Sequence, residues 1–240
     1  MQTLIIKLGA AGDVLRTTPL LHILQGDVDW ITSDNHTVLL KNLPGIRTCI
    51  AWKDRSNIFS NYYDLVISLE DALEIVGILE NIKYKNLFGA YRDSSGSMKY
   101  TDNSQSWFDM SIISAFGKEK ADQLKYQNRR SYQELVFTSL GHQFTGQSYS
   151  MVPARETELC GDIAIAPLAG SVWPMKNWAY YEEFYNKLKY EGYIVNFLPK
   201  RDNLLEHMGD IKNHKYLVSG DSLPMHIALG YGIKCLSIFI

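Results

Sequence analysis

Short apolar runs alternate with stretches of helical periodicity over most of the chain. The first run, Leu4–Leu8, is apolar apart from Lys7, which is typical of a strand covered on both faces of a parallel sheet. A second buried run, Tyr63–Leu69, follows in the same half of the chain. Strands of this kind separated by helices predict an α/β fold with doubly wound parallel sheets.

The alternation can be followed through the first half of the chain. Strands are predicted at Leu4–Leu8, Val28–Thr32, Arg47–Trp52 and Tyr63–Leu69, and helices near His36–Asn42, near Ala72–Asn81 and within Trp107–Leu140. The polar stretch Arg92–Ser106 is expected to be a long loop, and long loops are often functional.

A second series of strands and helices begins after a segment without periodicity. The predicted strands are Asp162–Ala166, Tyr193–Leu198, Lys215–Val218 and Lys234–Phe239, and the predicted helices are Trp178–Glu191, Arg201–Gly209 and Ser222–Tyr231. We place the domain boundary within His142–Glu158, so the domains are approximately 1–150 and 151–240. Two α/β domains in tandem imply a cleft between them, where ligand sites are common.

Composition and charge give no support for several classes of protein. The net charge of −2 gives no indication of binding to nucleic acid or to an anionic membrane. Three well-separated cysteines without Cys-x-x-Cys spacing suggest neither a disulfide framework nor a zinc site. With no signal peptide and no apolar run long enough to span a bilayer, we expect a cytoplasmic protein whose membrane contact, if any, is peripheral.

The first chemical motif joins the opening strand to a helix. Gly9 and Gly12 allow a tight turn, and Asp13 is expected to open the helix at the carboxyl end of the strand. The segment is neither a dinucleotide-binding fingerprint nor a P-loop. Asp13 is therefore either a helix N-cap or a catalytic base. The helix dipole favours an ionised carboxylate at this end of the helix, and both roles require the ionised form.

The second motif, Ser219–His226, follows a short strand and opens another helix. The free N–H groups of such a helix can bind a phosphate, with Asp221 and Ser222 beside them and His226 one turn further on. The alternative is an ordinary Asp/Ser cap followed by a helix histidine bonded to the backbone.

The third motif, Ala169–Trp178, lies between a strand and a helix and offers Ser171 and Lys176. Lys176 can neutralise a phosphate as a point charge. The alternative is a solvated surface lysine.

Taken in order, the three motifs resemble the family 9 glycosyltransferases, whose best-known members are ADP-heptose:lipopolysaccharide heptosyltransferases. The matching residues are Ile5–Leu15 with Thr17-Thr18-Pro19, then Gly170-Ser171 with Lys176 and Trp178, then Gly220-Asp221-Ser222 with Pro224-Met225-His226 and Ala228, and also Tyr63–Ile67. The resemblance covers most of the chain.

The resemblance implies a GT-B fold, two facing Rossmann-like domains, with the acceptor on the N-terminal domain and the nucleotide-sugar on the C-terminal one. It implies inverting transfer of a heptose-like sugar, with Asp13 as the base, to a cell-envelope glycan or lipid-linked acceptor. Donor binding is assigned to Gly170, Ser171, Lys176, Asp221, Ser222 and His226, and positioning of the acceptor or a phosphate to Gly12, Arg16, Thr17 and Thr18. An ADP-sugar is favoured as the donor, no cofactor is expected, and neither a metal nor an Asp-x-Asp metal site is expected.

The chain also departs from the family pattern. Leu223 stands where family members commonly have glycine, and the chain ends at Ile240, where family chains continue, so the C-terminal domain is expected to be shortened. Two alternatives therefore stay open. One is another GT-B enzyme, such as a nucleotide-sugar epimerase using His226 or His142, and the other is a non-catalytic protein that binds sugar nucleotides.

Overall fold

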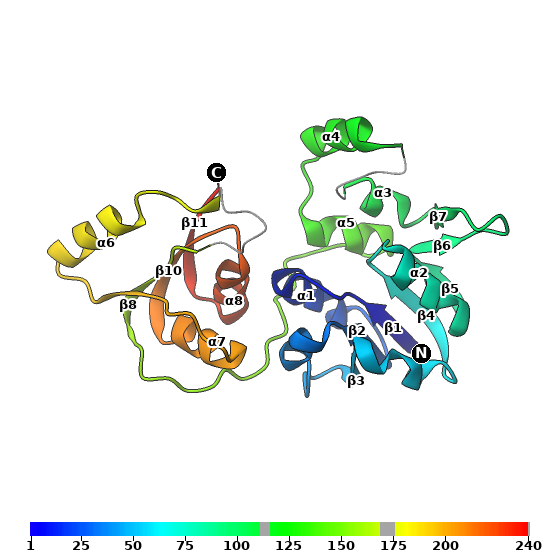
Figure 1. Cartoon of the computed structure of the whole chain (residues 1–240), viewed down its shortest axis with the longest axis horizontal. Coiled ribbons are helices and arrows are strands. Elements are labelled where there is room, and N and C mark those ends of the chain that lie inside the picture. The colour runs from blue at the N-terminus through cyan, green and yellow to red at the C-terminus, as the bar shows by residue number, and fades with distance from the viewer. Residues whose placement is uncertain (111–115, 169–175, 240) are drawn as a thin grey trace. The chain divides into compact units, whose positions relative to one another are not determined.

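The computed structural model describes residues 1–110, 116–168 and 176–239. The chain divides into two compact units, Met1–Ser148 and Tyr149–Ile240, and each contains its own parallel sheet (Figure 1). The α/β class predicted from the alternation of strands and helices is therefore confirmed. Among the described residues, no helix combines the length and the apolar character needed to cross a bilayer.

The first unit has a five-stranded parallel sheet in the order β3-β2-β1-β4-β5 and a small antiparallel hairpin, β6-β7 (Figure 1). Its strands are β1 (Gln2–Ile6), β2 (Asp27–Thr32), β3 (Ile46–Ala51), β4 (Tyr62–Ser68), β5 (Lys83–Phe88), β6 (Ala90–Arg92) and β7 (Met98–Tyr100). Its α-helices are α1 (Ala11–Thr17), α2 (Leu73–Ile78), α3 (Gln105–Phe108), α4 (Lys118–Gln127) and α5 (Tyr132–Ser139), and its 3-10 helices are η1 (Thr18–His22), η2 (Asp34–Leu39), η3 (Trp52–Ile58) and η4 (Leu79–Asn81). The strand order reverses between β1 and β4, which makes their carboxyl ends a topological switch point.

Strand β1 is the centre of this sheet and is buried on both faces. Leu4, Ile5 and Ile6 have no accessible surface. On one face, Leu4 and Ile6 belong to a core cluster that includes Ile58 from η3 and Ile75 from α2. This explains why the run at the start of the chain is continuously apolar instead of alternating.

The second unit has a four-stranded parallel sheet in the order β11-β10-β8-β9. Its elements are β8 (Gly161–Ala166), α6 (Tyr181–Tyr190), β9 (Val195–Phe197), α7 (Leu204–Lys212), β10 (His214–Gly220), α8 (Leu223–Tyr231) and β11 (Lys234–Ile238). Aromatic side chains of α6, including Tyr181, Phe184 and Tyr185, pack on the face of the sheet formed by residues such as Ile163 and Val218.

The prediction of one long loop over Arg92–Ser106 is wrong, because strand β7 lies within this stretch. The stretch begins at the last residue of β6, forms the turn of hairpin β6-β7 and ends in the first residues of α3. Asp93 Oδ1 closes the hairpin turn by accepting from the N–H groups of Ser95 (2.9 Å) and Ser97 (3.0 Å). Polar turn residues bond to their own backbone in this way, so a polar composition does not by itself indicate a loop.

Strand β5 was not predicted, because its exposed side chains break the apolar pattern. Lys83 and Lys85 are exposed on this edge strand. Lysines on an edge strand discourage pairing with another chain, so the charges belong to the strand and not to a loop.

Candidate functional site

A cleft of about 880 Å³ opens within the first unit beside the carboxyl ends of β1 and β4. Its lining includes the carboxylates of Asp13 and Glu70, the cations of Lys7 and Arg16, and the rings of Trp107 and Tyr132. Ligands of open α/β sheets bind at such a switch point. The first sequence motif therefore lies where the fold favours a ligand site.

Asp13 is the third residue of α1, not its first, so the prediction that Asp13 opens the helix is wrong by two residues. The N-cap position belongs to Ala10, whose backbone N–H donates to Asp13 Oδ2 at 3.2 Å. Asp13 Oδ1 forms an ion pair with Arg16 Nη2 at 2.7 Å, and the Asp13 side chain is 31% exposed. The carboxylate therefore closes the first helical turn and also faces the cleft.

The other residues of the first motif contribute in different ways. Gly12 is buried, as are Thr17 and Thr18. The Thr17 hydroxyl donates to the carbonyl of Asp13, and the Thr18 hydroxyl donates to that of Leu15, both at 2.7 Å. Arg16 lines the cleft. A role of these four residues in positioning an acceptor or a phosphate stays a prediction.

Two cleft residues that the sequence analysis did not assign, Lys7 and Glu70, form an ion pair across the switch point. Lys7 is only 7% exposed, and its Nζ donates to Glu70 Oε1 at 3.0 Å. The same oxygen accepts from the backbone N–H of Leu8 at 2.8 Å. A buried ammonium requires such a partner, and Glu70 meets this need by joining the end of β4 to that of β1. Its position directly after a buried strand was the available sequence signal.

Tyr132 was also missed, because it lies far from the first motif in sequence. It begins α5, and its hydroxyl is 2.6 Å from Thr17 Oγ1. The central carbon of the Arg16 guanidinium is 3.9 Å from the centroid of the Tyr132 ring. Only the folded chain brings α5 to α1, and no local pattern predicts this contact.

In the second unit, the structure brings Lys176 together with the second motif. Lys176 Nζ lies 2.7 Å from Asp221 Oδ2 and 3.3 Å from the Asp221 carbonyl oxygen. Asp221 directly follows β10, and Ser222 is the N-cap residue of α8 without a capping bond from its side chain. A cation therefore lies beside the start of a helix, which is a suitable arrangement for an anion.

The remaining residues assigned to donor binding have different positions. His226 is 8% exposed within α8, and its Nδ1 lies 3.3 Å from the Tyr149 hydroxyl. Gly170 and Ser171 lie outside the described residues. Donor binding by this set stays a prediction.

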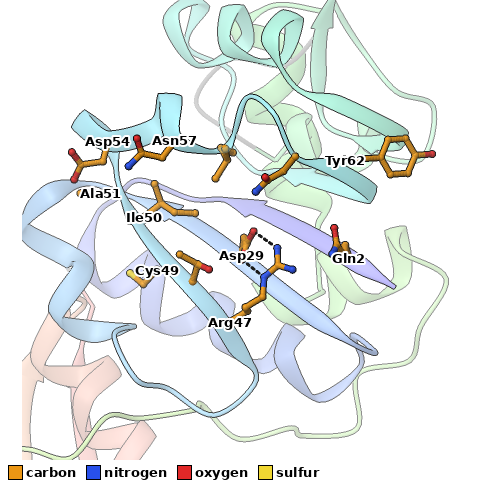
Figure 2. A pocket seen from close by; sticks show the side chains of 12 residues that line it. Gln2, Asp29, Arg47, Cys49, Ile50, Ala51, Asp54, Asn57 and Tyr62 are labelled. Carbon is orange, nitrogen blue, oxygen red and sulfur yellow. Dashed lines mark hydrogen bonds and ion pairs between the residues drawn. The ribbon is translucent and has the colours of Figure 1, made fainter.

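A second cavity in the first unit, of about 510 Å³, contains the Asp29–Arg47 ion pair (Figure 2). Asp29 is 1% exposed and accepts from Arg47 Nε at 3.0 Å, from Arg47 Nη2 at 2.6 Å and from the Tyr63 hydroxyl at 2.8 Å. Burial acts to raise the pKa of Asp29, but the hydrogen bonds from Arg47 and Tyr63 outweigh it and hold the pKa below its usual value. The polar groups at the base of this cavity are committed to one another, so we regard the pair as structural.

Asp29 and its neighbour Asp27 are also the residues to consider for a metal-binding site. Asp27-Val28-Asp29 has Asp-x-Asp spacing, a pair that the expectation of no Asp-x-Asp metal site did not take into account. Asp27 lies 3.4 Å from Arg47 Nη1, so both carboxylates turn toward the same guanidinium. In the part of the chain that the structure describes, no group of three or more histidine, cysteine or acidic side chains is arranged to hold a metal ion.

Comparisons with known proteins give a match of structure and not of sequence. No family model matches the chain, and no curated protein matches it. A family 9 glycosyl transferase from Veillonella parvula DSM 2008 matches with a TM-score of 0.69 at 16% identity, over 98% of this chain and 79% of that one. The fold is that of the family 9 glycosyltransferases.

Two Escherichia coli enzymes agree with this assignment of the fold. ADP-heptose lps heptosyltransferase II matches with a TM-score of 0.63 at 15% identity, over 99% of this chain and 84% of that chain. Heptosyltransferase WaaC, solved with ADP-2-deoxy-2-fluoro heptose, matches with a TM-score of 0.60 at 15% identity, over 99% and 88%. The chain therefore has a GT-B-like α/β architecture with two parallel sheets, as the resemblance of its sequence motifs implied.

Proposed function

We propose that this chain is an inverting glycosyltransferase that moves a sugar from a nucleotide diphosphate donor to a hydroxyl group of a cell-envelope glycan. The observation that carries the proposal is the position of Asp13. Its carboxylate is bonded to Ala10 and Arg16, faces a cleft at the switch point of the first sheet, and lies in a family 9 fold. A positioned and partly exposed carboxylate is the group that removal of a hydroxyl proton requires.

In the proposed reaction, the acceptor hydroxyl binds beside Asp13. Asp13 takes the proton as the acceptor oxygen forms a bond to the anomeric carbon of the donor sugar. The bond between that carbon and the diphosphate oxygen breaks on the opposite side, and its electron pair leaves with the diphosphate. Attack opposite the leaving group inverts the configuration, through a transition state with oxocarbenium character similar to that of glycoside hydrolysis.

The second unit is proposed to hold the donor. Lys176 and the positive end of the α8 dipole supply charge for the diphosphate, and Asp221, Ser222 and His226 lie at this end of the helix. Pro224 has no N–H to donate, and the N–H of Met225 donates to the carbonyl of Ser222. Charge builds up on the diphosphate as it leaves, so these groups stabilise the transition state more than the bound donor. Gly170 and Ser171 are proposed to complete this site.

An ADP-sugar is the preferred donor. Support comes from the matching E. coli heptosyltransferase, whose solved structures contain ADP and ADP-2-deoxy-2-fluoro heptose. The acceptor side is proposed to be the first unit, where cations and aromatic rings line one cleft. Aromatic faces pack on the apolar faces of sugar rings, and cations pair with acidic substituents. With a glycan or lipid-linked acceptor, the protein is proposed to work in the cytoplasm, at the inner face of the membrane.

The test is a panel of ADP-, UDP- and GDP-sugars. Binding is measured first by thermal shift, where a ligand at a hundredfold excess over its Kd adds about 2.7 kcal/mol of stability. Transfer to envelope glycan fragments is then measured with wild-type protein and with Asp13→Asn. Sugar transfer by the wild type and its loss in the variant support the proposal. Donor binding without transfer to any acceptor would instead favour the non-catalytic alternative.

A further inference from the structure

Tyr132 of α5 contacts Arg16 and Thr17, two residues of α1 that also contact Asp13. Its hydroxyl lies 2.6 Å from Thr17 Oγ1, and its ring packs against the Arg16 guanidinium at 3.9 Å. The Trp107 ring packs edge-on against the Tyr132 ring, with centroids 4.6 Å apart, and so limits its movement. One side chain is therefore in contact with two residues that in turn contact Asp13.

The first of these connections is a chain of two hydrogen bonds. Thr17 has a single hydroxyl proton and donates it to the Asp13 carbonyl oxygen at 2.7 Å. Thr17 Oγ1 must therefore accept from Tyr132. Burial raises the pKa of the Tyr132 phenol, so the phenol keeps its proton at any working pH. The chain runs from Tyr132 through Thr17 to the backbone of Asp13.

The second connection runs through Arg16 to the carboxylate. The Arg16 guanidinium lies over the Tyr132 ring, and this contact limits the directions in which its nitrogens can point. Arg16 Nη2 points to Asp13 Oδ1 at 2.7 Å. Tyr132 therefore constrains the Asp13 backbone through Thr17 and the Asp13 carboxylate through Arg16.

We propose that Tyr132 is a positioning residue for the Asp13 base. This inference rests on the proposed transferase function, because only that reaction gives Asp13 a proton to accept. Loss of the phenol hydroxyl slows the proton transfer and leaves the binding of donor and acceptor unchanged. A displacement of about 1 Å in a reacting group can lower the rate by up to about a hundredfold.

The experiment compares Tyr132→Phe with Tyr63→Phe. Both substitutions remove a hydroxyl from the first unit and keep the ring, and Tyr63 donates to Asp29 away from the cleft. We expect Tyr132→Phe to lower kcat about tenfold or more. The KM values for donor and acceptor should stay within about twofold, which identifies a loss confined to the transition state. Tyr63→Phe should lower the melting temperature to a similar extent and leave kcat unchanged.

A second pair of variants reports on the same connection if Tyr132→Phe fails to fold. Thr17→Val removes the hydroxyl that links Tyr132 to Asp13, whereas Thr17→Ser retains it. We expect Thr17→Val to show the loss of kcat and Thr17→Ser to restore most of it.

Three results would overturn the inference. If Asp13→Asn is inactive but Tyr132→Phe keeps the wild-type kcat, the proposed function stands and the positioning role is wrong. If the acceptor KM rises while kcat is unchanged, Tyr132 is a substrate contact and not a positioning residue. If the wild-type protein transfers no sugar from any donor in the panel, the proposed function fails and the inference fails with it.

Discussion

The Asp13–Arg16 pair of the first unit and the Lys176–Asp221 pair of the second unit are equally short and almost equally exposed. Both measure 2.7 Å, with side chains 32% and 31% exposed in the first pair and 30% and 39% in the second. What differs is the number of contacts that hold them. Asp13 has further bonds from Ala10 and Thr17, and its partner lies over the ring of Tyr132. Within residues 1–110, 116–168 and 176–239, the hydrogen bonds of the Lys176 side chain go to Asp221.

This difference agrees with the two proposed roles, a catalytic base for Asp13 and a phosphate-binding cation for Lys176. A base must stay in one position while a proton moves, so several contacts around Asp13 are useful. A cation that receives a diphosphate must give up its present partner, and an exposed ion pair contributes less than about 1 kcal/mol. The Lys176–Asp221 pair can therefore exchange Asp221 for a ligand at little cost.

The largest expected effect comes from Asp13→Asn. The amide cannot take the acceptor proton, so transfer should fall by roughly two to four orders of magnitude. Asparagine still accepts from the Ala10 N–H, so the melting temperature should change little. The measurement is transfer rate together with melting temperature, and Asp54→Asn, an exposed aspartate of the same unit, is the control. Near-normal transfer by Asp13→Asn would leave Asp13 with a capping role alone.

The next effect concerns stability and tests whether the Asp29–Arg47 pair is structural. Arg47→Met leaves the buried Asp29 carboxylate without its cation, which should lower the free energy of unfolding by about 3 kcal/mol at pH 7. Urea unfolding measures it, with the exposed Arg92–Glu80 pair as control: Arg92→Met should cost less than about 1 kcal/mol. A loss in Arg47→Met no larger than in Arg92→Met would contradict the structural assignment.

The same pair predicts a dependence of stability on pH. The folded-state pKa of Asp29 is below the usual value that the carboxyl has in the unfolded chain, so the ionised form stabilises the fold at pH values above that usual value. This contribution should be lost as the pH falls through the lowered folded-state pKa. Unfolding curves of wild type and Arg47→Met, measured between neutral and acid pH, should therefore converge at the acid end. A constant difference between the two proteins would show that Asp29 is not responsible.

A smaller effect is expected from Lys176→Ala. Losing a charge-assisted hydrogen bond should weaken the binding of a nucleotide diphosphate by roughly tenfold to a hundredfold. Binding of the nucleoside, which has no phosphate, should not change. Titration calorimetry with both ligands measures the difference, and Lys187→Ala, an exposed lysine on α6, is the control. Equal losses for the two ligands would mean that Lys176 does not contact phosphate.

The smallest effect is expected at Leu223, the first residue of α8. Leu223→Gly removes a side chain beside the proposed diphosphate site and should improve diphosphate affinity by less than tenfold, while glycine in the helix costs up to about 1 kcal/mol of stability. Leu223→Ala, which shortens the side chain with less effect on the backbone, is the companion variant. No gain in affinity from either would show that Leu223 does not restrict the site.

Local sequence was sufficient to predict the strands of the two parallel sheets other than β5, and the tight turn that joins β1 to the helix carrying Asp13. Each of these depends on residues that are close in the chain, such as an apolar run followed by a glycine turn. Glu70 and Tyr132 could not be assigned in this way, because their contacts with Lys7 and Thr17 span 63 and 115 residues. Hairpin β6-β7 was missed for another reason: the bonds of Asp93 to its own turn resemble a loop when only composition is considered.

The Lys7–Glu70 pair limits how these two positions can change in related chains. Glu70 Oε1 accepts from both the Lys7 ammonium and the Leu8 N–H. A lysine at position 70 has no acceptor to offer, so exchanging the two charges would leave the Leu8 N–H unpaired. We expect homologous chains to replace the pair jointly with uncharged residues, retaining a carbonyl or amide oxygen at position 70, and not to reverse its charges.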